Sequence, residues 1–287
     1  MQDKLDEWFA EDLGKGDFTT QAVVSNEICE AKVTGGPGVI SGLKICFDLL
    51  ERHNIDYISE YSDGDTINSS LILSLKGKAH DILATERLLL NILSHLSGIS
   101  THTNKIVRIA KKVNPQVEIL ATRKTLPGLR DFEKEAVVHG GGATHRMRLD
   151  DAILIKDNHL KLSKSIQKSI ELSRTKYPEL MVEVEADDEN QAIEIATHGA
   201  DRVMLDNFTP QEAVKAIKKL RQISNIEIEI SGGITIENIA DYAGSADFIS
   251  LGSLTETKNG FAGSVVSIVL TYPVWSSFWP YSGAISV

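Results

Sequence analysis

The feature that most limits the fold of this chain is a regular alternation of short apolar runs and amphipathic stretches from about residue 100 onward. Apolar runs alternating with helical patterns imply βαβ units and a parallel sheet. No GxGxxG turn follows the first run, so the pattern favours a closed (β/α) barrel over a dinucleotide-binding fold. The apolar runs are residues 117–124, 152–159, 181–187, 201–208, 226–233 and 247–254.

The first hundred residues show a different pattern of apolar and polar residues. Residues 20–80 contain short apolar runs separated by turn signals, which predict the strands of a small sheet. Residues 81–97 are apolar almost all round and predict a buried helix or a subunit contact. Arg87 lies in that segment, and a buried guanidinium must be paired, either with a carboxylate or with the carbonyls of a helix end. Residues 1–14 read as an amphipathic helix that Gly14 ends.

Composition narrows the class of protein. The 287 residues are 42% hydrophobic and 24% charged, as in a folded globular chain. A net charge of −10 argues against nucleic-acid binding, which needs a basic surface. Cys29 and Cys46 have no metal or redox spacing, so we expect buried free thiols in a reducing, cytoplasmic setting. The acidic N-terminus lacks the apolar segment of a signal peptide.

Polar or glycine residues end each predicted barrel strand. In a parallel barrel these ends open on one face, where active sites of this architecture lie. A single polar strand end is an ordinary turn, but six in succession indicate a site. In chain order the ends are Arg123 with Lys124, Lys156 with Asp157, Glu185, Asp206, Ser231 with Gly232 and Gly233, and Gly252 with Ser253.

The basic residues at this face predict an anion site. Arg123, Lys124, His145, Arg146 and Lys156 cluster within an acidic chain, and guanidinium forks bind carboxylate or phosphate in bidentate fashion. A Schiff-base lysine is the rival interpretation for either lysine. The glycines after the last two strands suit a phosphate held by backbone N–H groups.

The acidic members of the face have two interpretations. Carboxylates among phosphate-binding groups suggest Mg²⁺ or hydrogen bonds to sugar hydroxyls. The plainer alternative for Glu185 and Asp206 is a salt bridge to the same lysines. Taken together, the residues predict a barrel that binds one phosphorylated and one carboxylated anion, with Mg²⁺.

Several long motifs resemble the quinolinate phosphoribosyltransferase family, whose members are decarboxylating pyrophosphorylases that form nicotinate mononucleotide. The resemblance covers residues 8 to about 255 and rests on TRKTLPGLR, EKEAVVHGGGATHR, LIKDNH, VEVEAD, VMLDNF and EISGGI. It implies an N-terminal α+β open sandwich beside an incomplete (β/α) barrel. It also implies a homodimer, or a hexamer of dimers, in which each small domain covers the partner's barrel mouth.

The resemblance also implies roles for single residues. Motif position assigns the quinolinate carboxylates to Thr122, Arg123, Lys124, His145 and Arg146, with Arg87 supplied to the partner's site. It assigns phosphoribosyl pyrophosphate and Mg²⁺ to Lys156, Glu185 and Asp206, and the phosphate cradle to Ser231, Gly232, Gly233, Gly252 and Ser253. Lys124, Lys156, Glu185 and Asp206 are the expected catalytic residues, and Glu185 and Asp206 the expected metal ligands, direct or through water.

The sequence departs from the family near its end. After LGSLT the family pattern has His and Ser, whereas this chain has Glu256 and Thr257. A carboxylate there would repel pyrophosphate. Residues 259–287 contain no charged residue. Their length allows a membrane span, which the prolines disfavour; a segment packed on the small domain and a product of an altered reading frame are the other interpretations.

These observations give three domain ranges and three functional hypotheses. The ranges are an N-terminal domain over 1–100 that the tail joins, a barrel over 101–258 and the uncharged tail over 259–287. The first hypothesis is decarboxylating phosphoribosyl transfer to quinolinate in NAD biosynthesis. The alternatives are transfer to another aromatic acid such as nicotinate, and a catalytically weak anion-binding relative.

Overall fold

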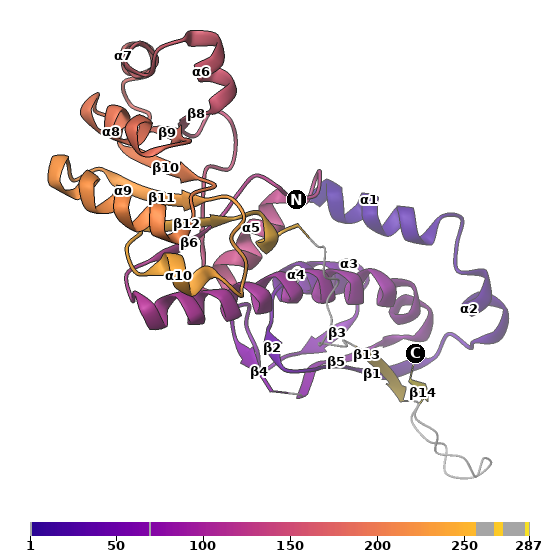
Figure 1. Cartoon of the computed structure of the whole chain (residues 1–287). Helices are drawn as coiled ribbons and strands as arrows, with labels where there is room; N and C mark the ends of the chain where they lie inside the picture. The colour runs from indigo at the N-terminus through magenta and orange to yellow at the C-terminus, as the bar shows by residue number, and fades with distance from the viewer. Residues whose placement is uncertain (1, 69, 257–266, 272–284, 287) are drawn as a thin grey trace. The chain divides into compact units, whose positions relative to one another are not determined.

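The computed structural model describes residues 2–68, 70–256, 267–271 and 285–286, and the chain divides into two compact units (Figure 1). We call the first, residues 1–101 with 259–287, the small unit, and the second, residues 102–258, the barrel unit. Helix α4 (Ala79–Val113) begins in the small unit and ends in the barrel unit. Each unit is described by itself below.

The small unit contains an antiparallel sheet in the order β14-β13-β1-β5-β3. Strand β1 alternates exposed and buried residues, so one face of the sheet carries the apolar side chains. The strands of this sheet are β1 (Ile28–Gly35), β3 (Asp56–Ile58), β5 (Ser70–Lys78), β13 (Ser267–Thr271) and β14 (Ile285–Ser286). Two further strands, β2 (Gly38–Val39) and β4 (Thr66–Ile67), pair with each other.

Three helices precede α4 in the small unit: α1 (Gln2–Leu13), α2 (Phe18–Val23) and α3 (Leu43–Arg52). Gly14, at φ +55°, follows α1 as predicted, because a glycine adopts this left-handed conformation without a Cβ clash. Asp17 caps α2 by accepting the Thr20 N–H. Cys29 and Cys46 are free, buried thiols, as predicted.

Of the two interpretations of residues 81–97, a buried helix does not hold at Arg87, and a subunit contact stays a prediction. Arg87 is exposed, and its neighbour Glu86 is buried instead, with 7% of its surface accessible. Arg87 and Asn91 lie one turn apart on the open side of α4, while Leu88, Leu89 and Leu90 are buried. The helix is therefore amphipathic at this turn, a periodicity that the dense apolar composition concealed.

The barrel unit contains a curled parallel sheet in the order β7-β6-β12-β11-β10-β9-β8. Its edge strands β7 and β8 are consecutive in the sequence, and among the described residues no pairing joins them. This confirms the predicted incomplete (β/α) barrel. The strands are β6 (Glu118–Ala121), β7 (Ala143–Thr144), β8 (Ile153–Ile155), β9 (Val182–Ala186), β10 (Arg202–Asp206), β11 (Glu227–Ser231) and β12 (Phe248–Leu251).

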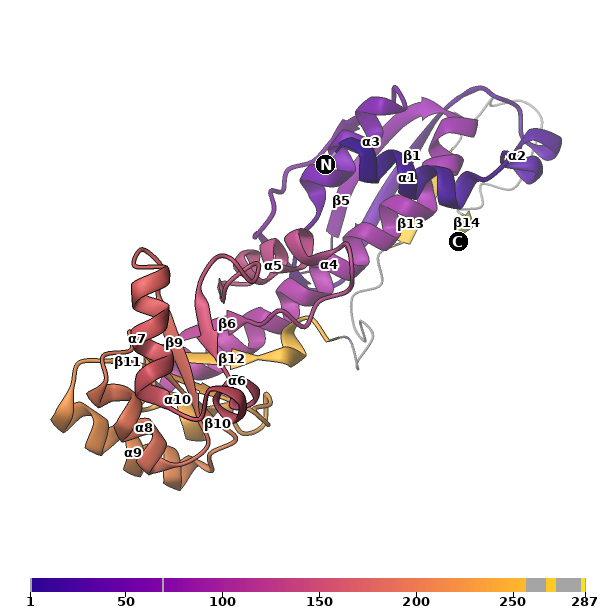
Figure 2. The same cartoon turned by 90° about the horizontal axis from the view of Figure 1, so that it is seen from above.

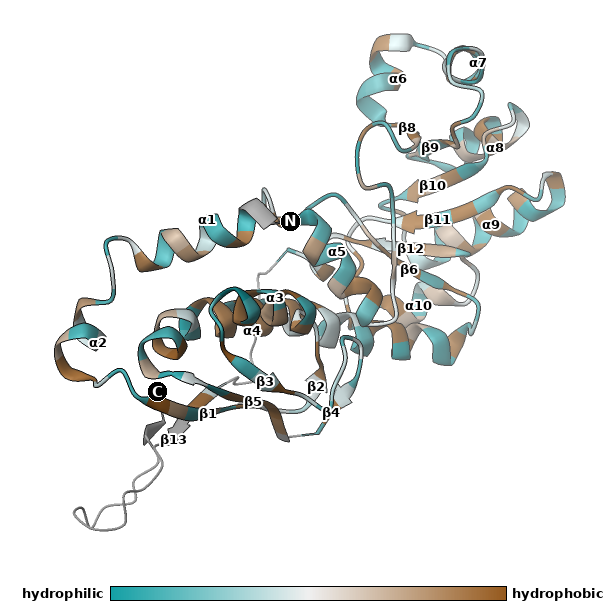
Figure 3. Ribbon diagram, turned by 180° about the vertical axis from the view of Figure 1, so that it is seen from behind, coloured by the Kyte–Doolittle hydropathy of each residue, from teal (hydrophilic) through white to brown (hydrophobic). Residues whose placement is uncertain are grey.

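Helices α7 to α9 lie along the outside of this sheet (Figures 1 and 2). Helix α9 begins with Thr209 and Glu212 in a capping box and Pro210 in its first turn. Its buried residues lie on one side, and Figure 3 shows both apolar and polar patches along it. The helices of this unit are α5 (Arg130–His139), α6 (Asp157–Ser163), α7 (Ile166–Lys176), α8 (Glu189–Thr197), α9 (Pro210–Ile223) and α10 (Ile239–Ala243), followed by the 3₁₀ turn η1 (Gly252–Leu254).

The uncharged tail contributes a strand to the small unit. Strand β13 pairs antiparallel with β1, with Val269 opposite Lys32 and Ile268 buried. A helix apolar and long enough to cross a membrane does not occur in the described parts of the chain. Thr257 and most of the tail lie outside the described residues.

Candidate active site

The carboxyl ends of the barrel strands bring most of the predicted site residues to one edge of the sheet. Asp206 lies in register with Ser231, and Ala121 lies in register with Leu251 on one side and Thr144 on the other. The residues that follow neighbouring strands therefore lie next to one another at this edge of the sheet. We call this edge the barrel mouth: Thr122 to Lys124, His145 and Arg146, Lys156, Glu185, Asp206, Ser231 to Gly233, and Gly252 and Ser253.

A buried layer of charged side chains lies below the mouth. Residues two apart in a strand share a face, so Glu183 lies one step deeper than Glu185. In the same way Glu229 lies below Ser231, and Arg202 lies two such steps below Asp206. Glu183 and Glu229 have no exposed surface. Carboxylates at such depth need partners, since desolvation disfavours the charged form.

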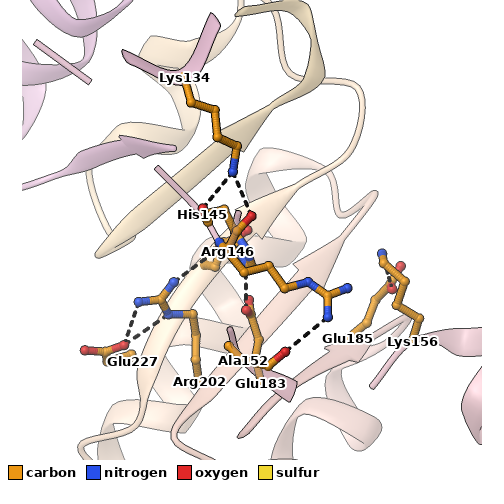
Figure 4. A network of polar contacts seen from close by, with 10 residues as sticks. Lys134, His145, Arg146, Ala152, Lys156, Glu183, Glu185, Arg202 and Glu227 are labelled. Carbon is orange, nitrogen blue, oxygen red and sulfur yellow. Dashed lines mark hydrogen bonds and ion pairs between the residues drawn. The ribbon is translucent and has the colours of Figure 1, made fainter. Parts of the chain in front are cut away.

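The partners of this layer are His145 and Arg202 (Figure 4). His145 Nε2 lies 2.8 Å from Glu183 Oε2 and 3.6 Å from Glu229 Oε2. Arg202 donates to Glu229 at 3.3 Å and to Glu227 at 2.8 Å, and its guanidinium lies 3.7 Å from the centre of the Phe248 ring. The layer thus joins strands β9, β10, β11 and β12 to the end of β7.

Burial changes the ionisation of this layer. Desolvation raises the pKa of Glu183 to about 7, against an opposing pull from Arg202. Desolvation also raises the pKa of Glu229 to about 7, and the adjacent Glu183 carboxyl adds to the rise. Burial lowers the pKa of His145. The two carboxyls therefore favour holding protons at a pH where an exposed glutamate is fully ionised.

His145 does not present a donor to the mouth, contrary to the prediction. Its Nδ1 accepts the backbone N–H of Arg146 at 2.8 Å, and its Nε2 lies against Glu183. The first contact places the ring proton on Nε2, where it is donated to the carboxyl. The side chain is 7% exposed. The imidazole thus orients the turn that carries Arg146 instead of offering a hydrogen bond to a ligand.

Four cationic side chains form a basic group beside the mouth: Arg123, Arg130, Lys134 and Arg146. Burial, and then the neighbouring Arg123, lower the pKa of Arg146. Arg123 Nε is buried and has no hydrogen-bond partner among the described residues. Arg146 donates to the carbonyl of Ala152 at 3.2 Å, across the gap between β7 and β8. Like charges held together in this way favour an anion between them.

A second group combines one lysine with two carboxylates. Lys156 Nζ lies 2.9 Å from Glu185 Oε2, so the salt bridge kept as an alternative is present. Burial raises the pKa of Glu185, Lys156 opposes the rise, and the neighbouring Asp206 adds to it. Adjacent carboxylate oxygens that repel one another suit a hard divalent cation, so the residues fit Mg²⁺.

Lys124 at the mouth faces the unexpected Glu256. Lys124 Nζ lies 3.8 Å from Glu256 Oε1, and both side chains are exposed. The Thr255 hydroxyl donates to the Lys124 carbonyl at 2.7 Å, which ties the turn after β12 to the loop after β6. A Cβ at Gly252 would lie 2.8 Å from Lys124 Cδ, so the lysine side chain crosses this turn close to its backbone. Glu256, the carboxylate expected to repel pyrophosphate, thus lies beside a lysine that motif position assigns to the quinolinate carboxylates.

The turn after β11 has the backbone of an anion cradle. Gly232 and Gly233 have φ of +87° and +63°, in the left-handed region that glycine tolerates. Asn207, also at positive φ, donates its amide to the Asp206 carboxylate and its backbone N–H to the Ser231 carbonyl.

Three predicted residues remain to be placed. The Thr122 hydroxyl accepts the Lys124 N–H at the mouth, and Ser253 lies in η1. Arg87 lies in the small unit.

Sequence reasoning missed the buried layer. The signal was present in VEVEA and IEIEIS, where glutamates alternate with aliphatic residues inside strands that are buried on both faces. Lys134 and Asn207 were also missed. Nothing in their local sequence distinguishes a buried lysine from an exposed one, or a strained asparagine from an ordinary turn residue.

Comparison with known families covers nearly the whole chain. Residues 17–97 match the model of the quinolinate phosphoribosyl transferase N-terminal domain, and residues 99–260 match the C-terminal domain. A probable nicotinate-nucleotide pyrophosphorylase (carboxylating) from Archaeoglobus fulgidus is 42% identical over 84% of this chain and 94% of its own length. The protein of the same description from Bacillus subtilis is 39% identical over 88% of each.

Solved structures are similar to this chain over most of its length. NadC from Streptococcus pyogenes superposes with a TM-score of 0.88 at 34% identity, over 94% of this chain and 96% of the other. The nicotinate-nucleotide pyrophosphorylase from Francisella tularensis gives a TM-score of 0.87 at 32% identity, over 93% and 95%.

Proposed function

The chain belongs to the quinolinate phosphoribosyltransferase family, and from this premise we propose that it transfers a phosphoribosyl group from phosphoribosyl pyrophosphate to quinolinate. The products are nicotinate mononucleotide, pyrophosphate and carbon dioxide, as in NAD biosynthesis. The observation that carries the proposal is the basic group beside the mouth. This group consists of Arg123, Arg130, Lys134 and Arg146, and the charge of Arg123 lowers the pKa of both Lys134 and Arg146. A bound dicarboxylate would offset this repulsion between like charges.

The carboxylates of quinolinate would bind Arg123 and Arg146. The unpaired Arg123 Nε needs an acceptor, and the Arg146 guanidinium has donors beyond the one used on Ala152. A pair of unit charges at about 4 Å is worth roughly 4 kcal/mol at an effective dielectric near 20. Two such pairs offset the cost of stripping water from the carboxylates.

Phosphoribosyl pyrophosphate would lie across the other side of the mouth. Lys156 lies beside Glu185 on this side. Lys124, which motif position assigns to the carboxylates, would serve this side instead, because its side chain crosses the turn at Gly252. The Ser231–Gly233 turn and the Gly252–Ser253 turn would offer backbone N–H groups to phosphate oxygens. Glu185 and Asp206 would hold Mg²⁺ or the ribose hydroxyls. Bound there, Mg²⁺ supplies positive charge for the departing pyrophosphate.

The reaction is a displacement followed by a decarboxylation. The pyridine nitrogen attacks the anomeric carbon of ribose as the bond to pyrophosphate breaks. Lys156 stabilises the departing oxygen, and Glu185 and Asp206 stabilise the cationic sugar. The quaternary nitrogen then stabilises the electron pair left on C2 when the 2-carboxylate leaves as carbon dioxide, and C2 takes up a proton. The protein need not form a covalent intermediate, which argues against a Schiff-base role for Lys124 or Lys156.

We also propose that the site is completed in a homodimer. Arg87 is exposed on α4 in the small unit, where a partner's substrate can reach it. An exposed arginine among buried leucines suits a contact with another subunit. A hexamer of such dimers would use the same contact.

A product assay tests the function. Full-length protein is incubated with quinolinate, phosphoribosyl pyrophosphate and Mg²⁺, with nicotinate in a parallel reaction, and nicotinate mononucleotide and carbon dioxide are followed. Both products from quinolinate alone are expected. Product from nicotinate alone would replace the proposal with nicotinate phosphoribosyl transfer. Quinolinate binding without product would indicate the catalytically weak relative and direct attention to Glu256.

A further inference from the structure

Lys134 is a fully buried lysine at the edge of the site, and within the described part of the chain its ammonium donates to backbone carbonyls alone. It lies in α5 and has no exposed surface. Its Nζ donates to the carbonyl of His145 at 2.7 Å and to the carbonyl of Arg146 at 2.7 Å (Figure 4). Buried lysines usually pair with a carboxylate. Here two peptide dipoles of the mouth take that place.

The charge of Lys134 is held at a cost. Burial lowers its pKa to about 8. Of the charged groups around it, Arg130 on its own helix, Arg123 after β6 and Arg146 after β7 push the pKa down, and Asp151 after β7 pulls it up. A methionine would fill a similar volume without this electrostatic cost. Fold stability alone therefore gives no reason for an ammonium at this position.

The two carbonyls that Lys134 holds belong to the turn that aims Arg146. The same turn is fixed from below, where Glu183 holds the His145 ring and the ring accepts the Arg146 N–H. Beyond it, Asp151 accepts the N–H groups of Met147 and Arg148. Lys134 fixes the peptide units between these anchors. Arg130 also holds this turn, since it donates to the Met147 carbonyl at 3.1 Å, and Lys134 is the fully buried cation of the two.

We propose that Lys134 is a positioning residue of the carboxylate receptor, holding the His145–Arg146 peptides so that the Arg146 guanidinium meets the substrate dianion. This inference rests on the proposed function. It adds that the buried ammonium of Lys134, besides Arg123 and Arg146, favours a dianionic aromatic acid as the substrate. Quinolinate held next to this group favours the protonated ammonium, so binding is linked to a proton on Lys134.

Binding and kinetics of Lys134→Met and Lys134→Gln test the inference. Methionine removes both hydrogen bonds and the charge, whereas glutamine keeps an N–H donor without the charge. We expect KM for quinolinate to rise at least tenfold in Lys134→Met and less in Lys134→Gln. KM for phosphoribosyl pyrophosphate should stay within about twofold. Lys218→Met, an exposed lysine on α9, is the matched control and should behave as the wild type.

Proton linkage gives a readout that a merely structural lysine would not move. Calorimetric titration of wild-type protein with quinolinate at pH 8.5, in two buffers of different ionisation enthalpy, should show proton uptake. The affinity should fall between pH 7.5 and 9.5. In Lys134→Gln both effects should be absent. Because the wild-type measurement needs no variant, it decides the matter even where Lys134→Met does not fold.

The outcomes separate the two proposals. Wild-type protein that neither binds quinolinate nor forms product overturns the function. Wild-type protein that is active, but binds quinolinate with no proton uptake and no change of affinity across this pH range, overturns only the inference about Lys134. Equal losses for both substrates in Lys134→Met would overturn it as well, because they would indicate a general collapse of the mouth.

Discussion

Asn207 packs against Gly232 so closely that a Cβ at position 232 would lie 2.3 Å from Asn207 Oδ1 and 2.7 Å from its backbone nitrogen. The same asparagine donates its side-chain amide to Asp206. The missing side chain at Gly232 therefore leaves room for Asn207, which in turn holds Asp206, an expected Mg²⁺ ligand. The contact lies between consecutive strand ends, β10 and β11, and is independent of any bound ligand.

Gly232→Ala should damage both stability and catalysis. A left-handed conformation costs a non-glycine residue roughly 1–2 kcal/mol, and the clash with Asn207 adds to this because the backbone cannot yield as a side chain would. Gly233 is the matched control, since its φ is +63° and nothing lies within 4 Å of its added Cβ. Chemical denaturation and KM for phosphoribosyl pyrophosphate are the measurements. Equal losses in the two variants would show that the Asn207 contact is irrelevant.

The buried glutamates should make stability fall as pH rises through neutrality. The pKa of Glu229 is about 7 in the folded chain and 4.5 for a free side chain. The native state therefore binds more protons between these values, and the free energy of unfolding decreases as pH rises through this window. Glu229→Gln cannot ionise, so it should be relatively more stable at pH 8 than at pH 5, by on the order of 2 kcal/mol.

Denaturation curves of wild type and Glu229→Gln at both pH values measure this change. Glu118→Gln, at an exposed position of β6, serves as the control and should follow the wild type. Parallel pH profiles for wild type and Glu229→Gln would mean that Glu229 is ionised throughout and paired fully by Arg202 and His145.

The barrel was predictable because strand period, helix caps and polar strand ends all agree in the barrel unit. Strand β7 was not predicted, because two residues after a glycine run carry no period. His145 was misjudged for a physical reason as well. The sequence shows that a histidine lies near the barrel mouth, but only the structure shows that its ring contacts Glu183 below the mouth. For Arg87 the sequence left a buried helix and a subunit contact open, because composition does not show a single exposed position within an apolar run.

Glu256→Gln should strengthen binding of phosphoribosyl pyrophosphate. The carboxylate lies near Lys124 and competes with a phosphate for it. Both side chains are exposed, so the pair is worth about 1 kcal/mol or less, and KM should fall by roughly two- to fivefold. Glu194→Gln, exposed on α8, controls for net charge. The difference should shrink at high salt. A KM that rises in Glu256→Gln would mean that Glu256 assists binding, for instance through the metal.

Arg146→Ala should separate the two substrates. Its guanidinium belongs to the basic group, and truncating a buried charged partner of a ligand costs about 2–5 kcal/mol. KM for quinolinate should therefore rise at least thirtyfold, with much less effect on phosphoribosyl pyrophosphate. Arg148→Ala, exposed two residues along the same loop, is the control. Equal loss for both substrates would contradict the assignment of Arg146 to the carboxylates.

Subunit mixing tests whether Arg87 acts in a partner's site. Arg87→Ala removes a residue that the proposal lends to the partner, and Lys156→Ala removes one from the barrel mouth of the same chain. Each homodimer should be inactive, because every site lacks one of the two residues. A mixed dimer contains one site with both residues intact and one with neither, so activity should return to about half of the wild-type value per dimer. Differently tagged chains, co-expressed and purified through both tags, supply the mixed dimer. Verified mixed dimers that stay inactive would place Arg87 outside the partner's site, and an active Arg87→Ala homodimer would remove it from catalysis.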